Sequence, residues 1–383
     1  MAFAVGSKYG LSFIKESSFG VTPGSPAMTA VPVSGDDMNL SKDTFLSNTL
    51  TDNREVTDFR HGNRQAGGNL NFELRYGAFE PFMLGGLGAS AWVDAATITA
   101  STIAFVDSDP DTITDSGNAF VTSGFKAGDV LTVTGGVNDG VSVTVDTVVA
   151  GTITLTAGSA ITAASSGTSI TLTADRKQAT VGSNIDSFSF ERRFTDVGVY
   201  QVVTGARINT MSLNMQPNSI VTGSFGVLGK DVTNNTSSLD ATPTAWANND
   251  PMDSFTGAIT LDGTEVATIT SIDFNLNNNL SPAFVVGSPT LQQVLEERAN
   301  VSGTMNFYME DETILEAFKN ETEKSVEIRV SDGTNYYDFI FPRVKFGDAA
   351  APVSGFGGII INAPFQVLRD ATLGYGVKID KSS

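Results

Sequence analysis

The side chains that could support acid–base or metal chemistry are few in type and widely separated. Cysteine is absent, and His61 is the single histidine. One imidazole without thiolate partners cannot build the Cys- or His-rich sites that hold zinc. Nothing in the spacing places a serine and a carboxylate with it as a hydrolytic triad. We therefore interpret His61 as a surface histidine without a special role.

One acidic stretch resembles the start of a calcium-binding loop. Its sequence is Asp107-Ser108-Asp109-Pro110-Asp111. An EF-hand loop needs glycine at its sixth position and glutamate at its twelfth, and this chain has Thr112 and Asn118 there. The pattern favours an acidic turn, in which aspartates accept hydrogen bonds from nearby backbone amides. Weak adventitious calcium binding is the alternative.

Two glycine-containing stretches fail as nucleotide-binding loops. Gly86-Leu87-Gly88-Ala89-Ser90-Ala91 follows an expected helix, whereas a dinucleotide fingerprint follows a strand and opens a helix. In Val227-Leu228-Gly229-Lys230-Asp231, an aspartate replaces the hydroxyl residue that a phosphate loop requires. We expect no catalytic site, no cofactor and no bound metal, and we expect that the protein is not an enzyme.

Composition narrows the class of protein further. The chain has 383 residues, with 42 Asp and Glu against 23 Lys and Arg, which gives a formal net charge of −19. A protein that grips nucleic acid by its phosphates needs a basic surface, so this balance argues against that role. An acidic surface instead lets nucleic acid pass without sticking.

No segment of the sequence predicts membrane insertion or secretion. The first six residues lack the basic region and apolar core of a signal peptide. No apolar run approaches the roughly 18–20 residues that a membrane helix needs. We expect a soluble protein that is made in the cytoplasm and has no membrane partner.

An internal repeat organises the chain. Gly303-Thr304-Met305-Asn306-Phe307 matches Gly68-Asn69-Leu70-Asn71-Phe72 at an offset of 235 (303 − 68), and Asp273-Phe274-Asn275-Leu276 matches Asp37-Met38-Asn39-Leu40 at 236 (273 − 37). Two matches at nearly one spacing indicate a duplicated module. In each copy a strand precedes one short helix, which we expect at residues 77–84 and 311–320.

Abundant Gly, Thr, Ser, Val and Asn predict an all-β fold with many turns. Residues 92–180 differ in texture, with short Thr- and Val-rich strands and the hairpin signal Asn138-Asp139-Gly140. We interpret them as a small β-domain inserted in the first module. The predicted domains are residues 1–91 with 181–240 for the first module and arm, 92–180 for the insert, and 241–383 for the second module.

Each module contains a long polar segment, residues 41–67 in the first and 277–302 in the second. Long loops without structure of their own are uncommon unless they have a function. Both copies keep one, so we expect projecting hairpins that touch a neighbouring molecule. An ordinary flexible surface loop is the alternative.

Several segments together resemble the major tail tube proteins of long-tailed bacteriophages. They are Glu16-Ser17-Ser18-Phe19-Gly20-Val21-Thr22-Pro23, residues 203–225, and residues 301–318 with 339–345. Their order and spacing match that family over about three-quarters of the chain, all except the insert, which is similar to the immunoglobulin-like or related β-domains displayed outside some tails.

The resemblance implies two tandem β-sandwich modules with one short helix each, whose strands join those of other modules in a closed barrel. Rings of such barrels stack into a virion tail tube through which DNA is ejected. Two modules in each chain favour a trimeric ring with pseudo-sixfold symmetry, and a hexameric ring is the alternative. Tape-measure protein and DNA would occupy the lumen without specific binding, and tail terminator and tail tip proteins would bind the ends.

The resemblance also assigns expectations to single residues. We expect Asp273, Asn275 and Asn277, on one face of a strand, to line an acidic channel. The long polar loops and the N-terminal arm are the expected contacts between rings. Their candidate contact residues are Asp52, Arg54, Glu55, Arg60, Glu296 and Arg298.

Two other functions stay open from the sequence. One is another tail component, such as a tail tip, a connector or a surface-adhesion β-protein, which would not polymerise alone. The other is a virion-borne enzyme that degrades glycans, which would need two close carboxylates in a cleft.

Overall fold

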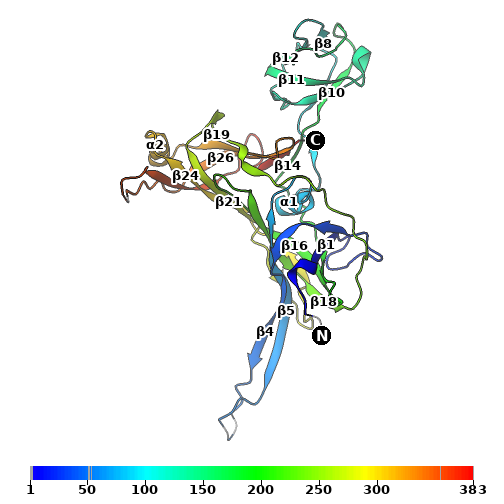
Figure 1. Cartoon of the computed structure of the whole chain (residues 1–383), viewed down its shortest axis with the longest axis vertical. Helices are drawn as coiled ribbons and strands as arrows, with labels where there is room; N and C mark the ends of the chain where they lie inside the picture. Colours follow the sequence, from blue (N-terminus) through cyan, green and yellow to red (C-terminus); the bar gives the residue numbers. More distant parts are fainter. Residues whose placement is uncertain (1–2, 51, 53, 354, 383) are drawn as a thin grey trace. The chain divides into compact units, whose positions relative to one another are not determined.

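We describe the protein from a computed structural model, covering residues 3–50, 52, 54–353 and 355–382. The chain forms two compact units (Figure 1). The first contains Met1–Ser90, Thr180–Thr334 and Ile340–Val377, and the second contains Ala91–Ala179, Asn335–Phe339 and Lys378–Ser383. The structure is mostly β, as the composition predicts, and the described residues contain two α-helices.

One continuous antiparallel sheet runs through the whole first unit. Its strands, from edge to edge, are β3 (Val33–Asp36) with β4 (Asn39–Leu46), β5 (Phe59–Glu73), β17 (Thr222–Gly229), β16 (Val199–Met215), β21 (Ile269–Asn277), β24 (Asn300–Tyr308), β27 (Ile360–Val367) and the end of β26 (Tyr336–Phe346). The two repeats meet where Thr210–Met215 of β16 pairs with Asn277–Ile272 of β21. Strands from both modules therefore share one sheet.

A second layer covers the first module. It consists of β2 (Thr29–Val31), β1 (Tyr9–Lys15), β15 (Phe188–Phe194), the first half of β16, and β18 (Asp231–Asn235). β16 can serve both layers because Gly205, with φ of 65°, breaks its ladder midway. The core between the layers is rich in phenylalanine: the Phe72 ring lies 4.7 Å from the Phe225 ring, and the Phe13 ring lies 4.7 Å from the Phe82 ring.

The second module repeats this plan with its own core. Its outer strands are β19 (Asp253–Leu261), β20 (Thr264–Glu265) and β25 (Lys324–Ser331). Phe274 and Phe341 pack edge to face at 5.2 Å. The repeated glycines are needed for close strand packing, because a Cβ atom at Gly303 would lie 2.1 Å from the carbonyl oxygen of Asp273, and one at Gly68 would lie 2.6 Å from the Cα of Met38.

Each module has one short helix, as predicted, although the bounds differ. α1 is Glu80–Leu87 and α2 is Thr313–Lys319. The first begins three residues later than residue 77, because Gly77 has a left-handed φ of 76° and a proline stands in the first helical turn. Gly88, also left-handed, ends it. Phe79, Phe82 and Met83 are buried.

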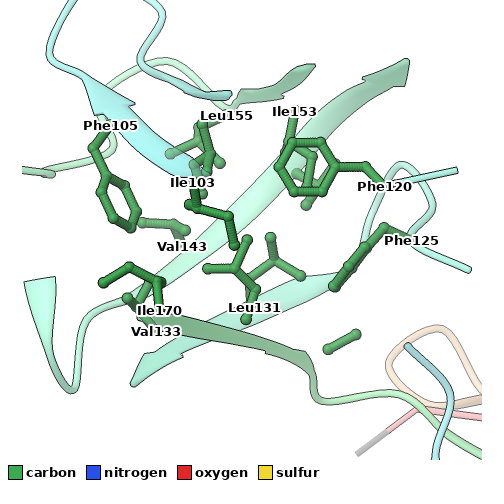
Figure 2. Close-up of a cluster of buried hydrophobic side chains, with 14 of the residues drawn as sticks. Ile103, Phe105, Phe120, Phe125, Leu131, Val133, Val143, Ile153, Leu155 and Ile170 are labelled. Atoms are coloured by element: carbon green, nitrogen blue, oxygen red, sulfur yellow. The ribbon is translucent and has the colours of Figure 1, made fainter. Parts of the chain in front are cut away.

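The second unit contains a seven-stranded sheet. Its order is β7 (Thr97–Ala100), β13 (Ile170–Ala174), β10 (Val130–Thr134), β11 (Ser142–Val149), β12 (Thr152–Leu155), β9 (Thr112–Asp115) and β8 (Ile103–Val106). Figure 2 shows Ile103, Phe105, Phe120 and Leu131 gathered in one apolar core. This unit therefore has a hydrophobic core of its own.

Two short segments that the sequence assigned to the second module group with the insert instead. β28 (Lys378–Lys381) pairs with β14 (Lys177–Thr180), which also pairs with β6 (Val93–Asp94). The Arg176 guanidinium donates hydrogen bonds to the carboxylates of Asp129 and Asp380, and all three side chains are buried. The rest of the predicted domain division stays a prediction.

The closed barrel implied by the family resemblance is not formed within the described part of one chain. β3 and β4 stand at one end of this strand order, and the last residues of β26 stand at the other, while β26 also pairs with β28. Closure of this sheet would need strands from further copies.

Candidate functional site: a polar sheet face and two long loops

β21 separates polar from apolar side chains by strict alternation. Ile272, Phe274 and Leu276 are buried in the core, whereas Asp273, Asn275 and Asn277 point to the opposite face. This is the face on which the sequence placed the channel-lining residues, and the structure puts all three side by side on it. That this face lines a channel stays a prediction.

Neighbouring strands extend this polar face across both modules. The ladder pairs Asn71 with Ser224, Ser224 with Ser212, Ser212 with Asn275, Asn275 with Ser302, and Ser302 with Gln366. Directly paired residues project from the same side of a sheet, so these six side chains form one row. We call this surface the polar face.

The polar face carries amide and hydroxyl groups more than acids. In the row beside the first one, Asn214 pairs with Asp273 and Asp273 pairs with Thr304. Partial burial raises the pKa of Asp273 above its usual value, because desolvation penalises the carboxylate. The polar face is therefore less acidic than the sequence led us to expect for a channel wall, although the chain as a whole carries a net charge of −19.

The first long segment forms an extended two-stranded hairpin from β4 and β5 (Figure 1). Asp52, Arg54 and Glu55 are exposed near its end, and Arg60 pairs with Asp58 at 3.5 Å, with both side chains mostly in solvent. An exposed pair of this kind contributes little to the stability of the monomer. The hairpin also exposes apolar side chains: Leu46 is 59 % exposed, Val56 is 65 % exposed and Phe59 is 53 % exposed.

The second long segment folds back on its own chain. It contains β22 (Ser281–Ala283) and β23 (Gln293–Leu295), and it buries Leu280, Leu291 and Val294 against Phe19, Ile185 and Leu228 of the first module. The backbone amide of Arg64 donates to the carbonyl of Pro289 at 2.8 Å. The guanidinium of Arg207 lies 3.7 Å from the carboxylate of Glu296.

The six predicted contact residues thus divide by loop. Asp52, Arg54, Glu55 and Arg60 lie on the projecting hairpin. Glu296 contacts the first module of the same chain, and Arg298 lines a cavity of about 590 Å³ in the second module. The assignment of all six to contacts between rings stays a prediction.

Comparison with known protein families gives one match. The family described as phage tail tube protein matches residues 6–184 and again residues 171–367. The chain belongs to the phage tail tube protein family. The two matched ranges follow one another along the chain with a short overlap, residues 171–184, and they support two tandem tail tube modules. No curated protein matches the chain.

Membership in this family identifies a structural tail protein and not an enzyme. The family places the protein in the virion tail and implies self-assembly into a tube. In the described ranges, no helix is long and apolar enough to cross a membrane. Over the same part of the chain, no three His, Asp or Glu side chains are grouped to hold a metal ion.

In and after the acidic stretch at residues 107–111, Asp111 and Asp115 are engaged in local hydrogen bonds. The Asp111 side chain accepts hydrogen bonds from the backbone amides of Ser108 and Ile161. Asp115 accepts from the amides of Gly117 and Ala119 and from the Thr102 hydroxyl, and the hydrogen bonds lower its pKa although burial opposes them. These contacts are those of acidic turns.

Sequence reasoning missed the group that orders the N-terminal arm. The buried carboxylate of Glu16 accepts hydrogen bonds from the Ser187 and Ser189 hydroxyls and from the backbone amides of Gly20 and Gly205. A carboxylate can be buried in this way because its acceptor capacity is filled. The sequence offered only a weak indication of this role, because Glu16 was noted only as part of the arm motif at residues 16–23.

Proposed function

We propose that this protein polymerises into stacked rings that form the tail tube, and that DNA passes along the channel into the host. Three chains make one ring with pseudo-sixfold symmetry, because each chain supplies two modules. The alternative is a hexameric ring in which the second module is an accessory domain. The observation that carries the proposal is the continuous sheet shared by both modules.

The junction between modules acts as an internal example of the contact between chains. Within the chain, the last strand of the first module's half-sheet, β16, pairs with the first strand of the second, β21. The equivalent outer segments are β3–β4, which pair with β5, and the end of β26 (residues 344–346), which pairs with β27. Pairing β26 of one chain with β3–β4 of the next would remove both edges and close the barrel.

The polar face then lines the channel. The opposite face of this sheet is buried in the module cores, so the polar face is the surface left for the lumen. Amides and hydroxyls hydrate the wall, because Asn71, Ser224, Ser212, Asn275 and Ser302 carry no charge. Lys345, which pairs with Gln366 at the end of the row, forms an ion pair with Glu321, so the row offers DNA phosphates little to bind. Tape-measure protein and DNA occupy this lumen in turn without specific binding.

Stacking needs a second, heterologous contact that does not close on itself. The start of the N-terminal arm is suited to this role, because Phe3 is 83 % exposed and Val5 is 51 % exposed there. Tail terminator and tail tip proteins would bind the last rings.

Electron microscopy of the purified chain tests this proposal. Long hollow tubes are expected, and averaged end views should show three chains in each ring. Persistent monomers over a wide range of salt and protein concentration would favour the second candidate, a tail tip or connector that does not polymerise alone. Six chains in each ring would refute the trimer while leaving the tube.

A further inference from the structure

The two modules treat the same loop position differently. Leu291 and Val294 lie 235 residues after Val56 and Phe59 (291 − 56 and 294 − 59), the offset that also relates Phe307 to Phe72. Leu291 and Val294 are 0 % and 1 % exposed, whereas Val56 and Phe59 are 65 % and 53 % exposed. The apolar character is shared, but only the second module buries it.

Cross-strand pairing extends the correspondence to a third position. Pro282 pairs with Val294 in the second module, and Leu46 pairs with Phe59 in the hairpin. Leu46 is 59 % exposed. Three apolar side chains at the equivalent place are therefore in solvent in the single chain, which is typical of a surface that is buried in an assembly.

The surface that receives the second module's loop has a counterpart too. In the first module the loop contacts Arg64 through its backbone and Leu228 through its side chain. Adding 235 to 64 gives Ala299. Leu228 pairs with Gly67, and Ser302 lies 235 residues after Gly67. Ser302 pairs with Gln366, so Gln366 is the counterpart of Leu228 in the second module. Ala299 and Gln366 both line the cavity of about 590 Å³.

The chemistry of this cavity suits the hairpin. Its wall includes the apolar side chains of Val301, Val367, Leu368 and Val377, and two arginines, Arg298 and Arg369. The described part of the hairpin end carries Asp52, Glu55 and Asp58 against Arg54 and Arg60, a small acidic excess. Apolar side chains would enter the cavity while the acidic end meets its arginines.

We propose that the cavity lined by Ala299 and Gln366 is the docking site for the β4–β5 hairpin of a second copy of this chain, the neighbour in the ring. Val56 and Phe59 take the places that Leu291 and Val294 occupy within the chain. The Arg64–Thr290 bridge predicts Ala299 of one copy beside Glu55 of the next, since 290 − 235 is 55. The inference rests on the proposed ring and names the contact that holds its chains together.

Cysteine crosslinking tests this contact cleanly, because the chain has no cysteine of its own. The double variant E55C/A299C is assembled into tubes, oxidised, and run on a denaturing gel without reductant. Bridging requires Cα atoms within roughly 7 Å, so only close residues react. We expect covalent species of two and three chain masses. The matched control R64C/T290C should close a bond within one chain, with loss of free thiols and no gain in mass.

The outcomes separate the two proposals. Tubes of E55C/A299C that keep free thiols, or that link only within single chains, would overturn the hairpin contact and leave the tube intact. A parent chain that forms no tubes would overturn the proposed function instead. E55C/E265C, which places the second cysteine on exposed β20, should give no multimers, and a ladder from it as strong as that from E55C/A299C would also overturn the contact.

Discussion

Replacing Phe59 by alanine should weaken assembly without weakening the chain. The Phe59 ring lies on the exposed face of the hairpin, beside His61 at 5.1 Å and opposite Leu46. It is 53 % exposed in the single chain. If the hairpin docks on the neighbouring chain, the exposed half of the ring becomes buried only in the ring.

The size of the effect follows from that exposed fraction. Full burial of a phenylalanine side chain is worth about 1.5–3 kcal/mol, so burying the remaining half contributes about 0.8–1.5 kcal/mol in each chain. Each 1.4 kcal/mol is a factor of ten in an equilibrium constant. The critical concentration for tube formation should therefore rise about fourfold to tenfold in Phe59→Ala.

Sedimentation of tubes over a dilution series measures the critical concentration, and urea unfolding of the unassembled chain measures stability. Trp246, in the first unit, reports unfolding when Trp92 is replaced by phenylalanine. Phe59→Ala should change the free energy of unfolding by less than about 0.5 kcal/mol, as exposed substitutions do.

Val294→Ala is the matched control at the equivalent position. Val294 is 1 % exposed, and the substitution removes two buried carbon groups, so the monomer should lose about 2 kcal/mol including the cavity left behind. A Phe59→Ala chain that assembles at the parental critical concentration would refute the argument from the repeat. A loss of monomer stability equal to that of Val294→Ala would show that Phe59 already belongs to the monomer core.

Two further predictions concern buried charge. Arg176→Met leaves the buried carboxylates of Asp129 and Asp380 without their main cation, so the free energy of unfolding of the second unit should fall by about 3–5 kcal/mol. Urea unfolding with Trp92 as reporter, in a Trp246→Phe background, measures this loss. Adding Asp380→Asn should restore part of the stability, and no loss in Arg176→Met would contradict the buried ion pair. The raised pKa of Asp273 means that its ionised form opposes folding above that pKa and that the penalty fades as the pH falls through it. Asp273→Asn should therefore melt at a higher temperature than the parent at pH 7, with the difference lost below about pH 3.9, and an equal difference at both pH values would exclude titration of Asp273 as its cause.

The repeat made most of the fold of the first unit predictable from sequence. Gly68 and Gly303 recur because backbone or a side chain lies where a Cβ atom would stand, and Phe72 and Phe307 recur because each fills a module core. Alternation on β21 placed Asp273, Asn275 and Asn277 on one face, which the structure confirms as shared. Such patterns are local and survive divergence.

Features that depend on distant segments were not predictable. The pairing of Arg176 with Asp380 joins residues 204 positions apart, and no local sequence pattern around either residue predicts the other. The second long loop was expected to project like the first, but Leu291 and Val294 lie against the first module. The offset of 235 relates the two loops in sequence, yet only tertiary structure tells which copy is covered.

That difference between equivalent loops has a thermodynamic consequence for assembly. In the proposed ring, every second contact between modules lies within a chain, where the tether makes association intramolecular and concentration-independent. The covered loop of the second module, with Leu291 at 0 % exposure, is that contact already formed. The exposed hairpin would make the same contact with a second chain, so the strength of that contact, together with the pairing of β26 with β3–β4, sets the concentration at which rings close. A substitution at Phe59 should therefore shift the assembly threshold, and one at Val294 should instead shift the stability of the subunit that assembles.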